Sequence, residues 1–234
     1  MKMTYNGVVT LLVLLLTSIM GKAQTQPPVR SGVDLGAAFG QQNTIPSVFY
    51  HQTLQTQRTG PLFVGWGVRI NGVYASDLKL SAKENDSLSD SLYAGKSRSN
   101  QIQLVLSVGV RIGKVADIGI NTDLLGIAFG PQREVLYRMA LSASAPDSVA
   151  ALHNTLIGAS PRFMNVNASL GSHHNGQNEA FLRLWLGRQI ALKFSWVVVR
   201  VAYTSELDLY NKQRHFSAIY GMPQAALTIP LFSQ

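Results

Sequence analysis

Residues 101–113 read QIQLVLSVGVRIG, and every even position among them carries an aliphatic side chain. The odd positions carry mostly polar, small or charged side chains, such as Gln103, Ser107, Gly109 and Arg111. A two-residue period places alternate side chains on opposite faces of a β-strand, whereas a helix would spread them around its circumference. The stretch therefore predicts a strand with one wholly aliphatic face.

A second alternating segment follows immediately. Residues 117–124 read DIGINTDL, and the short link over 113–116 is rich in turn-forming and small residues. Two alternating segments joined by so short a link predict an antiparallel hairpin.

The two faces of this hairpin differ in an informative way. The apolar face is a smooth aliphatic wall, whereas the other face carries Gly109, Arg111, Gly119, Asn121 and Asp123. Apolar faces of soluble sheets vary in side-chain size because they interlock with a core. Small and charged residues suit a narrow, crowded, polar interior. We therefore expect the wall to face lipid and the opposite face to line a closed barrel.

Composition agrees with a single membrane-embedded β domain. The chain has 234 residues, of which 46% are hydrophobic and only 14% charged, against about 25% charged in soluble domains. It has no cysteine, which excludes disulfides, thiolate metal sites and thiol nucleophiles. We expect no cofactor and no metal, since the neighbouring His173 and His174 point to opposite faces of any strand. The net charge of +8 is scattered, which argues against a nucleic-acid partner.

The N-terminal residues 1–23 have the pattern of a secretory signal peptide. Lys2 precedes an apolar run over 8–16, and Gly21 and Ala23 are small residues of the kind that a signal peptidase requires. The alternative is a membrane anchor, for which the run is short. Residues 24–31 would then form a short periplasmic tail, and residues 32–234 the barrel.

Alternation along the whole chain predicts an all-β, closed antiparallel up-and-down transmembrane barrel of about eight strands. Two long outer loops are expected at about 77–99 and 131–177, and the reversed parity after Val197 predicts a β-bulge near Val197 to Val199. An even strand number with alternating short and long links places both termini in the periplasm. The expected strands cover residues 32–41, 46–56, 61–76, 100–113, 116–130, 178–187, 190–205 and 214–233.

This organisation resembles the small eight-stranded outer-membrane β-barrel proteins of Gram-negative bacteria, with OmpA-like and OmpX-like architecture. The resemblance covers about Gly32 to Gln234 and implies a location in the outer membrane. It also implies contact with outer-membrane lipid and insertion by the barrel assembly machinery. Such barrels often end on an aromatic residue that this machinery recognises, whereas here Ser233 and Gln234 follow Phe232.

An eight-stranded barrel has an interior that side chains can fill. We expect inward charged residues to form a buried polar network, and outward aromatic residues to lie at the membrane interfaces. A solitary histidine, His51, is expected to be a hydrogen-bonded group of the lumen or surface. The predicted network comprises Arg69, Arg111, Asp123, Arg183 and Lys193, and the predicted interfacial aromatics are Trp66, Tyr74, Trp196 and Tyr203.

The favoured function is a non-enzymatic barrel with a side-chain-filled lumen. Its surface loops would serve structural, adhesive or other interaction roles, with an extracellular partner that the sequence does not identify. Ser87, Ser91 and Ser148 each follow an aspartate and precede an aliphatic residue. This tripeptide resembles an O-glycosylation acceptor of some Gram-negative bacteria, so these serines are candidate modification sites.

Two alternatives remain open from the sequence. His215 and Ser217 resemble the His-x-Ser pair of outer-membrane lipid A deacylases and would share one strand face, as a lipid-modifying hydrolase requires. However, no Asp or Glu follows Asp208 to orient the histidine. The other alternative is a soluble, lipocalin-like periplasmic carrier, which would turn the aliphatic wall inward around an apolar ligand.

Overall fold

The computed structural model describes residues 29–56, 60–83, 89–140, 150–166, 173–187 and 189–233. The predicted signal peptide over 1–23 lies outside them. The described residues are almost entirely β-structure and include one 3-10 turn, η1 (Tyr210–Lys212). Among these residues no helix is long and apolar enough to cross a membrane. The strands are β1 (Val29–Phe39), β2 (Asn43–Gln55), β3 (Leu62–Ser81), β4 (Ser91–Ile112), β5 (Ala116–Phe129), β6 (Arg133–Arg138), β7 (Leu156–Pro161), β8 (Met164–Val166), β9 (Gly176–Leu186), β10 (Ile190–Ser205) and β11 (His215–Ser233).

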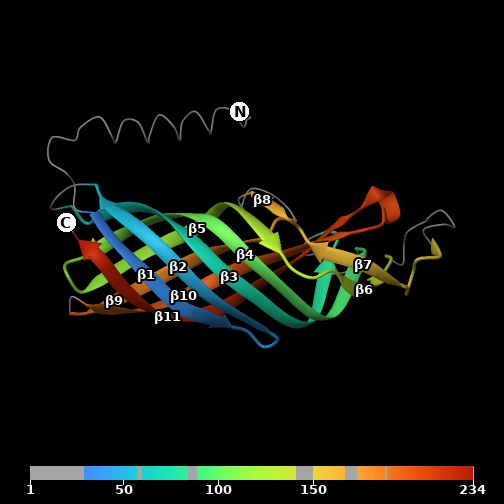
Figure 1. The fold of residues 1–234 in the computed structure, drawn as a ribbon, viewed down its shortest axis with the longest axis horizontal. Coiled ribbons are helices and arrows are strands. Elements are labelled where there is room, and N and C mark those ends of the chain that lie inside the picture. The colour runs from blue at the N-terminus through green and yellow to red at the C-terminus, as the bar shows by residue number, and fades with distance from the viewer. Residues whose placement is uncertain are drawn as a thin grey trace, which may run out of the picture.

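Eight of these strands form a closed antiparallel ring. The ring runs β1, β2, β3, β4, β5, β9, β10 and β11, and β11 returns to pair with β1. Each strand pairs with the ring strand that follows it in sequence, which is up-and-down topology. The first residues of β1 and the last residues of β11 lie at the same end of the ring (Figure 1). An all-β, antiparallel, up-and-down arrangement is therefore confirmed.

The eight ring strands match the predicted segments closely, but the first begins earlier. β1 starts at Val29, so Val29 to Ser31 belong to the ring and not to the predicted N-terminal tail. Alternation locates these strands because their two faces meet different surroundings along their whole length.

The predicted outer loops are wrong in large part. β3 continues to Ser81 and β4 begins at Ser91, so most of 77–99 is strand. The stretch 131–177 contains β6, β7 and β8. The extended parts of β3 and β4 carry exposed polar residues such as Lys79 and Lys96 on the outside and the buried Leu80 on the inside. The many polar residues here predict a loop. They occur in strands because the outer face beyond the aliphatic wall is no longer apolar.

Beyond the eight-stranded ring, the sheet closes again with fewer strands. Leu92 of β4 pairs with Tyr137 of β6, β6 pairs with β7, and β7 pairs with the end of β10. Ser217 of β11 pairs with Ser81 of β3, which completes the circuit. We call this narrower ring of β3, β4, β6, β7, β10 and β11 the projecting ring. It lies at the end of the molecule opposite the two described chain ends (Figure 1).

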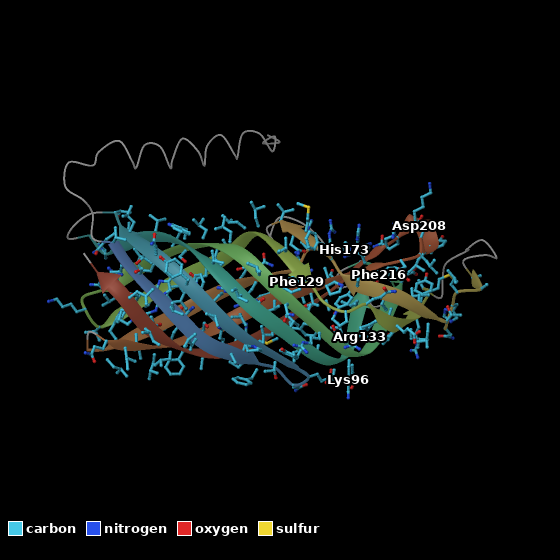
Figure 2. All side chains as sticks on the ribbon, in the orientation of Figure 1. Lys96, Phe129, Arg133, His173, Asp208 and Phe216 are labelled. Atoms are coloured by element: carbon cyan, nitrogen blue, oxygen red, sulfur yellow. The ribbon has the colours of Figure 1, made fainter. Side chains whose placement is uncertain are left out.

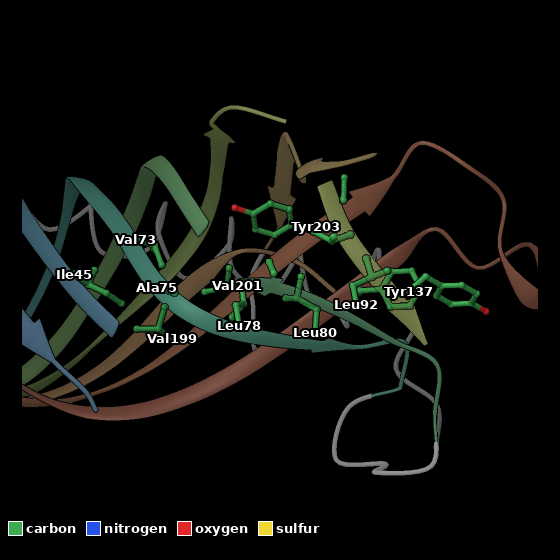
Figure 3. Close-up of a cluster of buried hydrophobic side chains, with 14 of the residues drawn as sticks. Ile45, Val73, Ala75, Leu78, Leu80, Leu92, Tyr137, Val199, Val201 and Tyr203 are labelled. Atoms are coloured by element: carbon green, nitrogen blue, oxygen red, sulfur yellow. The ribbon is translucent and has the colours of Figure 1, made fainter. Parts of the chain in front are cut away.

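An apolar core fills the projecting ring and the neighbouring end of the eight-stranded ring. It includes Leu78, Leu80, Leu92 and Tyr137, all essentially inaccessible. Figure 3 shows these side chains gathered inside the sheet, and the cluster extends toward Ile45 and Val73. The core explains why Val197 and Val199 reverse the polarity of β10.

No β-bulge lies near Val197 to Val199, contrary to the prediction. β10 pairs with β9 and with β11 in unbroken register through this region. The odd positions of β10 point inward throughout, from Lys193 in the polar part of the ring to Val197, Val199 and Tyr203 in the apolar part. The interior changes from polar to apolar, whereas the strand does not shift. Register shifts occur instead beside Leu104, opposite β5, and between Ser31 and Gly32.

The outer face of the eight-stranded ring is apolar. The even residues of β4 from Ile102 to Ile112 point outward, as do Ile118 and Ile120 of β5 and Leu192 and Phe194 of β10. Many large hydrophobic side chains on this face are a third to two thirds exposed. The face assignment made from the central hairpin therefore holds for the ring: the aliphatic wall is outside and the charged residues are inside.

Candidate functional site

The interior of the eight-stranded ring is the most elaborate polar site in the described chain. Four basic and four acidic side chains lie inside, each between 1% and 7% exposed. They come from β1, β3, β4, β5, β9 and β10, so the site exists only when the ring is closed. The residues are Arg69, Arg111, Arg183, Lys193, Asp34, Asp117, Asp123 and Glu179.

The eight charges form one continuous series of alternating sign. It begins at the end of the ring near the chain ends, where Arg111 Nε lies 3.0 Å from Asp117 Oδ1. Arg183 follows, 3.7 Å from Asp117 and 3.0 Å from Asp34. We call the whole series the ion-pair chain.

The second half of the ion-pair chain runs toward the middle of the ring. Lys193 Nζ lies 2.9 Å from Asp34 Oδ2 and 2.7 Å from Glu179 Oε1. Arg69 then contacts both Glu179, at 2.8 Å, and Asp123, at 3.0 Å. Every charge therefore has an opposite neighbour, which is the condition under which buried charges are tolerated.

Further hydrogen bonds reach the carboxylates of the ion-pair chain. Asn121 donates to Glu179 at 2.8 Å, and the backbone N–H of Gln177 donates to Asp123 at 2.8 Å. The Thr228 hydroxyl donates to Asp34 at 2.7 Å. Such a network restricts the rotamers of its members.

Each interior cation also lies over an aromatic ring. Arg69 is 5.0 Å from the ring centre of Phe49, Arg111 is 5.6 Å from Phe63, and Arg183 is 5.3 Å from Phe181. Lys193 lies between Phe49 and Phe181, at 5.3 and 5.1 Å. Cation–π contacts add to the ion pairs and fill the space between them.

Inward glycines make room for these rings. Gly109 pairs directly with Phe63, and Gly119 pairs with Phe181. A Cβ atom at Gly109 would collide with the Phe63 ring and with the Ile118 carbonyl oxygen.

A Gly109→Ala variant is therefore expected to lose about 1–3 kcal/mol of unfolding free energy through overpacking. Gly95→Ala is the matched control, because a Cβ there would meet nothing within 4 Å. Urea unfolding of the two variants in detergent measures the difference. Equal stability of both variants would contradict the packing described for the interior.

Uncharged amides separate the ion-pair chain from the apolar core. Asn71 donates to Gln177 at 3.5 Å, Gln177 donates to Gln224 at 3.1 Å, and Gln224 donates to Ser47 at 3.1 Å. All four side chains are buried. The interior thus changes along the ring from charged, through uncharged polar, to apolar.

The structure brings all five predicted lumen residues into the ion-pair chain, but it also contains acids that the prediction did not include. These acids occupy positions of the same parity as the inward residues of their own strands: Asp34 in β1, Asp117 in β5 and Glu179 in β9. A charge count would have found them, because four buried cations require about as many anions. His51 is buried, with Nε2 3.2 Å from Asp34 Oδ1, as expected of a hydrogen-bonded lumen group.

The predicted interfacial aromatics divide into two groups. Trp66, Tyr74 and Trp196 are 40–56% exposed on the outer face. Tyr203 is completely buried in the apolar core, where its hydroxyl contacts Ser97, so its assignment to an interface is wrong. It follows the inward parity of β10, which the prediction had reversed.

The candidate glycosylation sites receive little support from the structure. Ser87 and Ser148 lie outside the described residues. Ser91 is the first residue of β4, is only 3% exposed, and donates from its hydroxyl to the Ser89 carbonyl at 3.0 Å. A transferase could not reach this hydroxyl in the folded chain, so Ser91 is not an acceptor there.

His215 and Ser217 do share the outward face of β11, but each contacts a different residue. His215 Nδ1 lies 3.1 Å from Thr204 Oγ1, whereas Ser217 Oγ lies 3.0 Å from His173 Nδ1. Ser217 is only 2% exposed. A nucleophile must reach its substrate, so this geometry does not favour hydrolysis. Among the described residues no group of three or more His, Asp or Glu could hold a metal ion.

Two histidines near Ser217, His174 and His215, lie beside other basic groups. Burial lowers the pKa of His174 and of His215, and the neighbouring Arg162 lowers both further. The backbone N–H of Val166 donates to His174 Nδ1 at 3.3 Å, a bond that protonation of Nδ1 would remove. The folded chain therefore holds these rings neutral more strongly than the unfolded chain does.

Because both pKa values are lowered on folding, the neutral rings contribute stability above the unfolded pKa of about 6.5, and acid removes it. We expect the Val166 amide to exchange several-fold faster at pH 5.5 than at pH 7.5, after correction for intrinsic exchange. Hydrogen-exchange mass spectrometry measures this. The His174→Gln, His215→Gln double variant should lose most of the dependence, and retaining it would contradict the assignment.

No protein-family model matches the chain, and no curated protein matches it.

Proposed function

We propose that this chain is an outer-membrane β-barrel without enzymatic activity, whose sealed lumen anchors a rigid projecting ring at the cell surface. The observation that carries the proposal is the inverted distribution of polarity. Large aliphatic side chains such as Leu104, Val108 and Ile120 are exposed on the outside, whereas the ion-pair chain is buried inside. Exposure of these aliphatic side chains to water is unfavourable, whereas their contact with lipid is not.

Closure of the ring supports the same proposal. Lipid offers no hydrogen-bond partner to a free strand edge, so only a closed sheet can cross a membrane with strands. β1 pairs with β11 over most of its length. The barrel assembly machinery and outer-membrane lipid are the partners that this proposal requires.

The filled interior supports an anchor in preference to a channel. The ion-pair chain occupies one half of the ring, and the apolar core closes the other. A solute would have to displace buried ion pairs and a packed core, which is costly. We therefore expect no open conductance in a planar bilayer.

The projecting ring is the part suited to interaction. Its outer surface carries exposed charged side chains, including Lys79, Lys96, Arg133 and Asp208, and Figure 2 labels the last three of these. Its apolar core makes it a rigid platform. A structural or adhesive role toward an extracellular partner fits such a platform.

The polarity distribution opposes the lipocalin-like alternative, which needs an apolar cavity within the ring. The hydrolase alternative rests on Ser217, whose hydroxyl contacts His173 at 3.0 Å, but its burial leaves no route for lipid substrate. Neither alternative explains the exposed aliphatic wall.

Membrane fractionation followed by gel electrophoresis with and without boiling tests the proposal. We expect the protein in the outer-membrane fraction, and we expect a faster-migrating folded form before boiling. A single species that remains soluble in the periplasm would overturn the proposal.

A further inference from the structure

A cavity of about 310 Å³ lies at the end of the eight-stranded ring where the described chain begins and ends. We call it the mouth cavity. Its lining includes Arg30, Ser31, His51, Arg111, Lys114 and Trp185. It is separate from the projecting ring, and its geometry does not depend on whether lipid or detergent surrounds the wall.

We propose that the mouth cavity binds a phosphate group, either as inorganic phosphate or as a phosphate monoester. The first argument is that two residues lining this cavity each carry a buried polar atom without a hydrogen-bond partner. The atoms are Ser31 Oγ and His51 Nδ1, and the side chains are only 2% and 4% exposed. Most buried polar atoms are paired, so two unpaired atoms in the lining of one charged cavity favour a ligand there.

The His51 ring is held in an orientation that suits an anion. Its Nε2 lies 3.2 Å from both Arg183 Nη2 and Asp34 Oδ1. If Nε2 accepts from Arg183, the neutral ring carries its proton on Nδ1, and the protonated ring carries one there as well. In these two forms Nδ1 is a hydrogen-bond donor, whereas the neutral tautomer in which Nε2 donates to Asp34 would make Nδ1 an acceptor, so binding of an anion would select a form with a proton on Nδ1.

The charge balance supplies the second argument. The ion-pair chain inside the ring contains equal numbers of cations and anions, so it is neutral as a whole. Arg30 and Lys114 add two positive charges at the mouth cavity. The carboxylate that lines it, Asp117, already accepts from Arg111 at 3.0 Å and from the Trp185 indole at 3.0 Å.

The two cations beside the cavity would be neutralised more fully by a doubly charged phosphate than by a singly charged carboxylate. A phosphate offers several acceptor oxygens, which can engage the planar Arg30 guanidinium, the Ser31 hydroxyl and the Lys114 ammonium together. Arg30 lies 5.9 Å from the ring centre of Trp185, which borders the same cavity. The cavity volume leaves space for a small organic group on the phosphate.

Isothermal titration calorimetry on the full-length protein in an uncharged detergent tests the site. The titrants are inorganic phosphate, glycerol 3-phosphate and acetate, at constant ionic strength and after gel migration has shown that the protein is folded. We expect both phosphates to bind and acetate not to bind. Tighter binding of glycerol 3-phosphate would identify the monoester as the preferred ligand, whereas tighter binding of inorganic phosphate would identify the free ion.

The Arg30→Gln, Lys114→Gln double variant should bind phosphate at least about tenfold more weakly, a loss of about 1.4 kcal/mol. Ser31→Ala should weaken binding in the same direction. Lys96→Gln is the matched control, because it removes an exposed cation that does not line the mouth cavity. No phosphate binding by the folded protein, equal binding of acetate, or unchanged affinity in the double variant would each overturn the proposal. None of these results bears on membrane location.

Discussion

Replacing Arg69 by methionine is expected to destabilise the protein by about 3–5 kcal/mol, because it leaves buried anions without their cation. Arg69 is only 1% exposed and contacts Asp123 at 3.0 Å and Glu179 at 2.8 Å. Methionine retains much of the volume, so the lost charge dominates the effect. Urea unfolding in phospholipid vesicles, followed by tryptophan fluorescence, measures the change.

Two further variants separate charge from packing. Lys96→Met removes an exposed cation and should change the unfolding free energy by no more than about 0.5 kcal/mol. Adding Asp123→Asn to Arg69→Met restores neutrality inside the ring, so the double variant should be more stable than Arg69→Met alone. If Arg69→Met were no worse than Lys96→Met, the ion-pair chain would not hold the ring together.

Placing an arginine on the aliphatic wall should have an effect of similar size for a different reason. Leu104 is 40% exposed and pairs with Val68 and Leu125 in the middle of the wall. If the wall faces lipid, Leu104→Arg should cost about 2–4 kcal/mol in vesicles, the range for arginine near the bilayer midplane. The same unfolding measurement detects it.

Ser76→Arg is the matched control for this prediction. Ser76 is exposed on the outer face of β3, beyond the aliphatic wall, and arginine there should cost about 0.5 kcal/mol or less. A solvent-facing wall would make the two substitutions equivalent. Equal effects would therefore contradict the lipid-facing assignment.

The sequence was sufficient to predict the eight ring strands because their outward residues are mostly apolar and their inward residues are mostly polar, small or charged. Leu104 and Arg111 of β4 illustrate the two faces within one strand. The same contrast identified the interior cations, since Arg69 and Lys193 could not lie on the aliphatic face.

The projecting ring could not be predicted by the same argument. In β3 the wall residues and the core residues Leu78 and Leu80 all occupy even positions. The inward parity of the strand changes where Ser76 and Asp77 are both exposed, so Leu78 and Leu80 point inward whereas the even residues of the wall point outward. In β10 the parity is unchanged, and Val199 and Tyr203 are apolar because the odd positions there face the core. Along β10, apolar residues move from even to odd positions. Such a switch can arise from a β-bulge or from a change in the environment of each face, and only the unbroken pairing of β10 with its neighbours shows that the environment changes.

The acidic half of the ion-pair chain depends on contacts that sequence distance conceals. Asp34 and Lys193 are far apart in the chain, yet Nζ and Oδ2 lie 2.9 Å apart across the ring. Their proximity follows from the closure between β1 and β11 and from the register of that pairing. Alternation predicts which residues point inward, but not which of them meet.

The most direct test of the lipid-facing wall is the accessibility of spin labels in vesicles. The chain has no cysteine, so Leu104→Cys and Lys96→Cys each give a single labelling site. We expect the label at 104 to collide with oxygen dissolved in lipid and to be protected from a water-soluble nickel complex, whereas the label at 96 should meet the nickel complex freely. Equal access of the nickel complex to both labels would contradict the account.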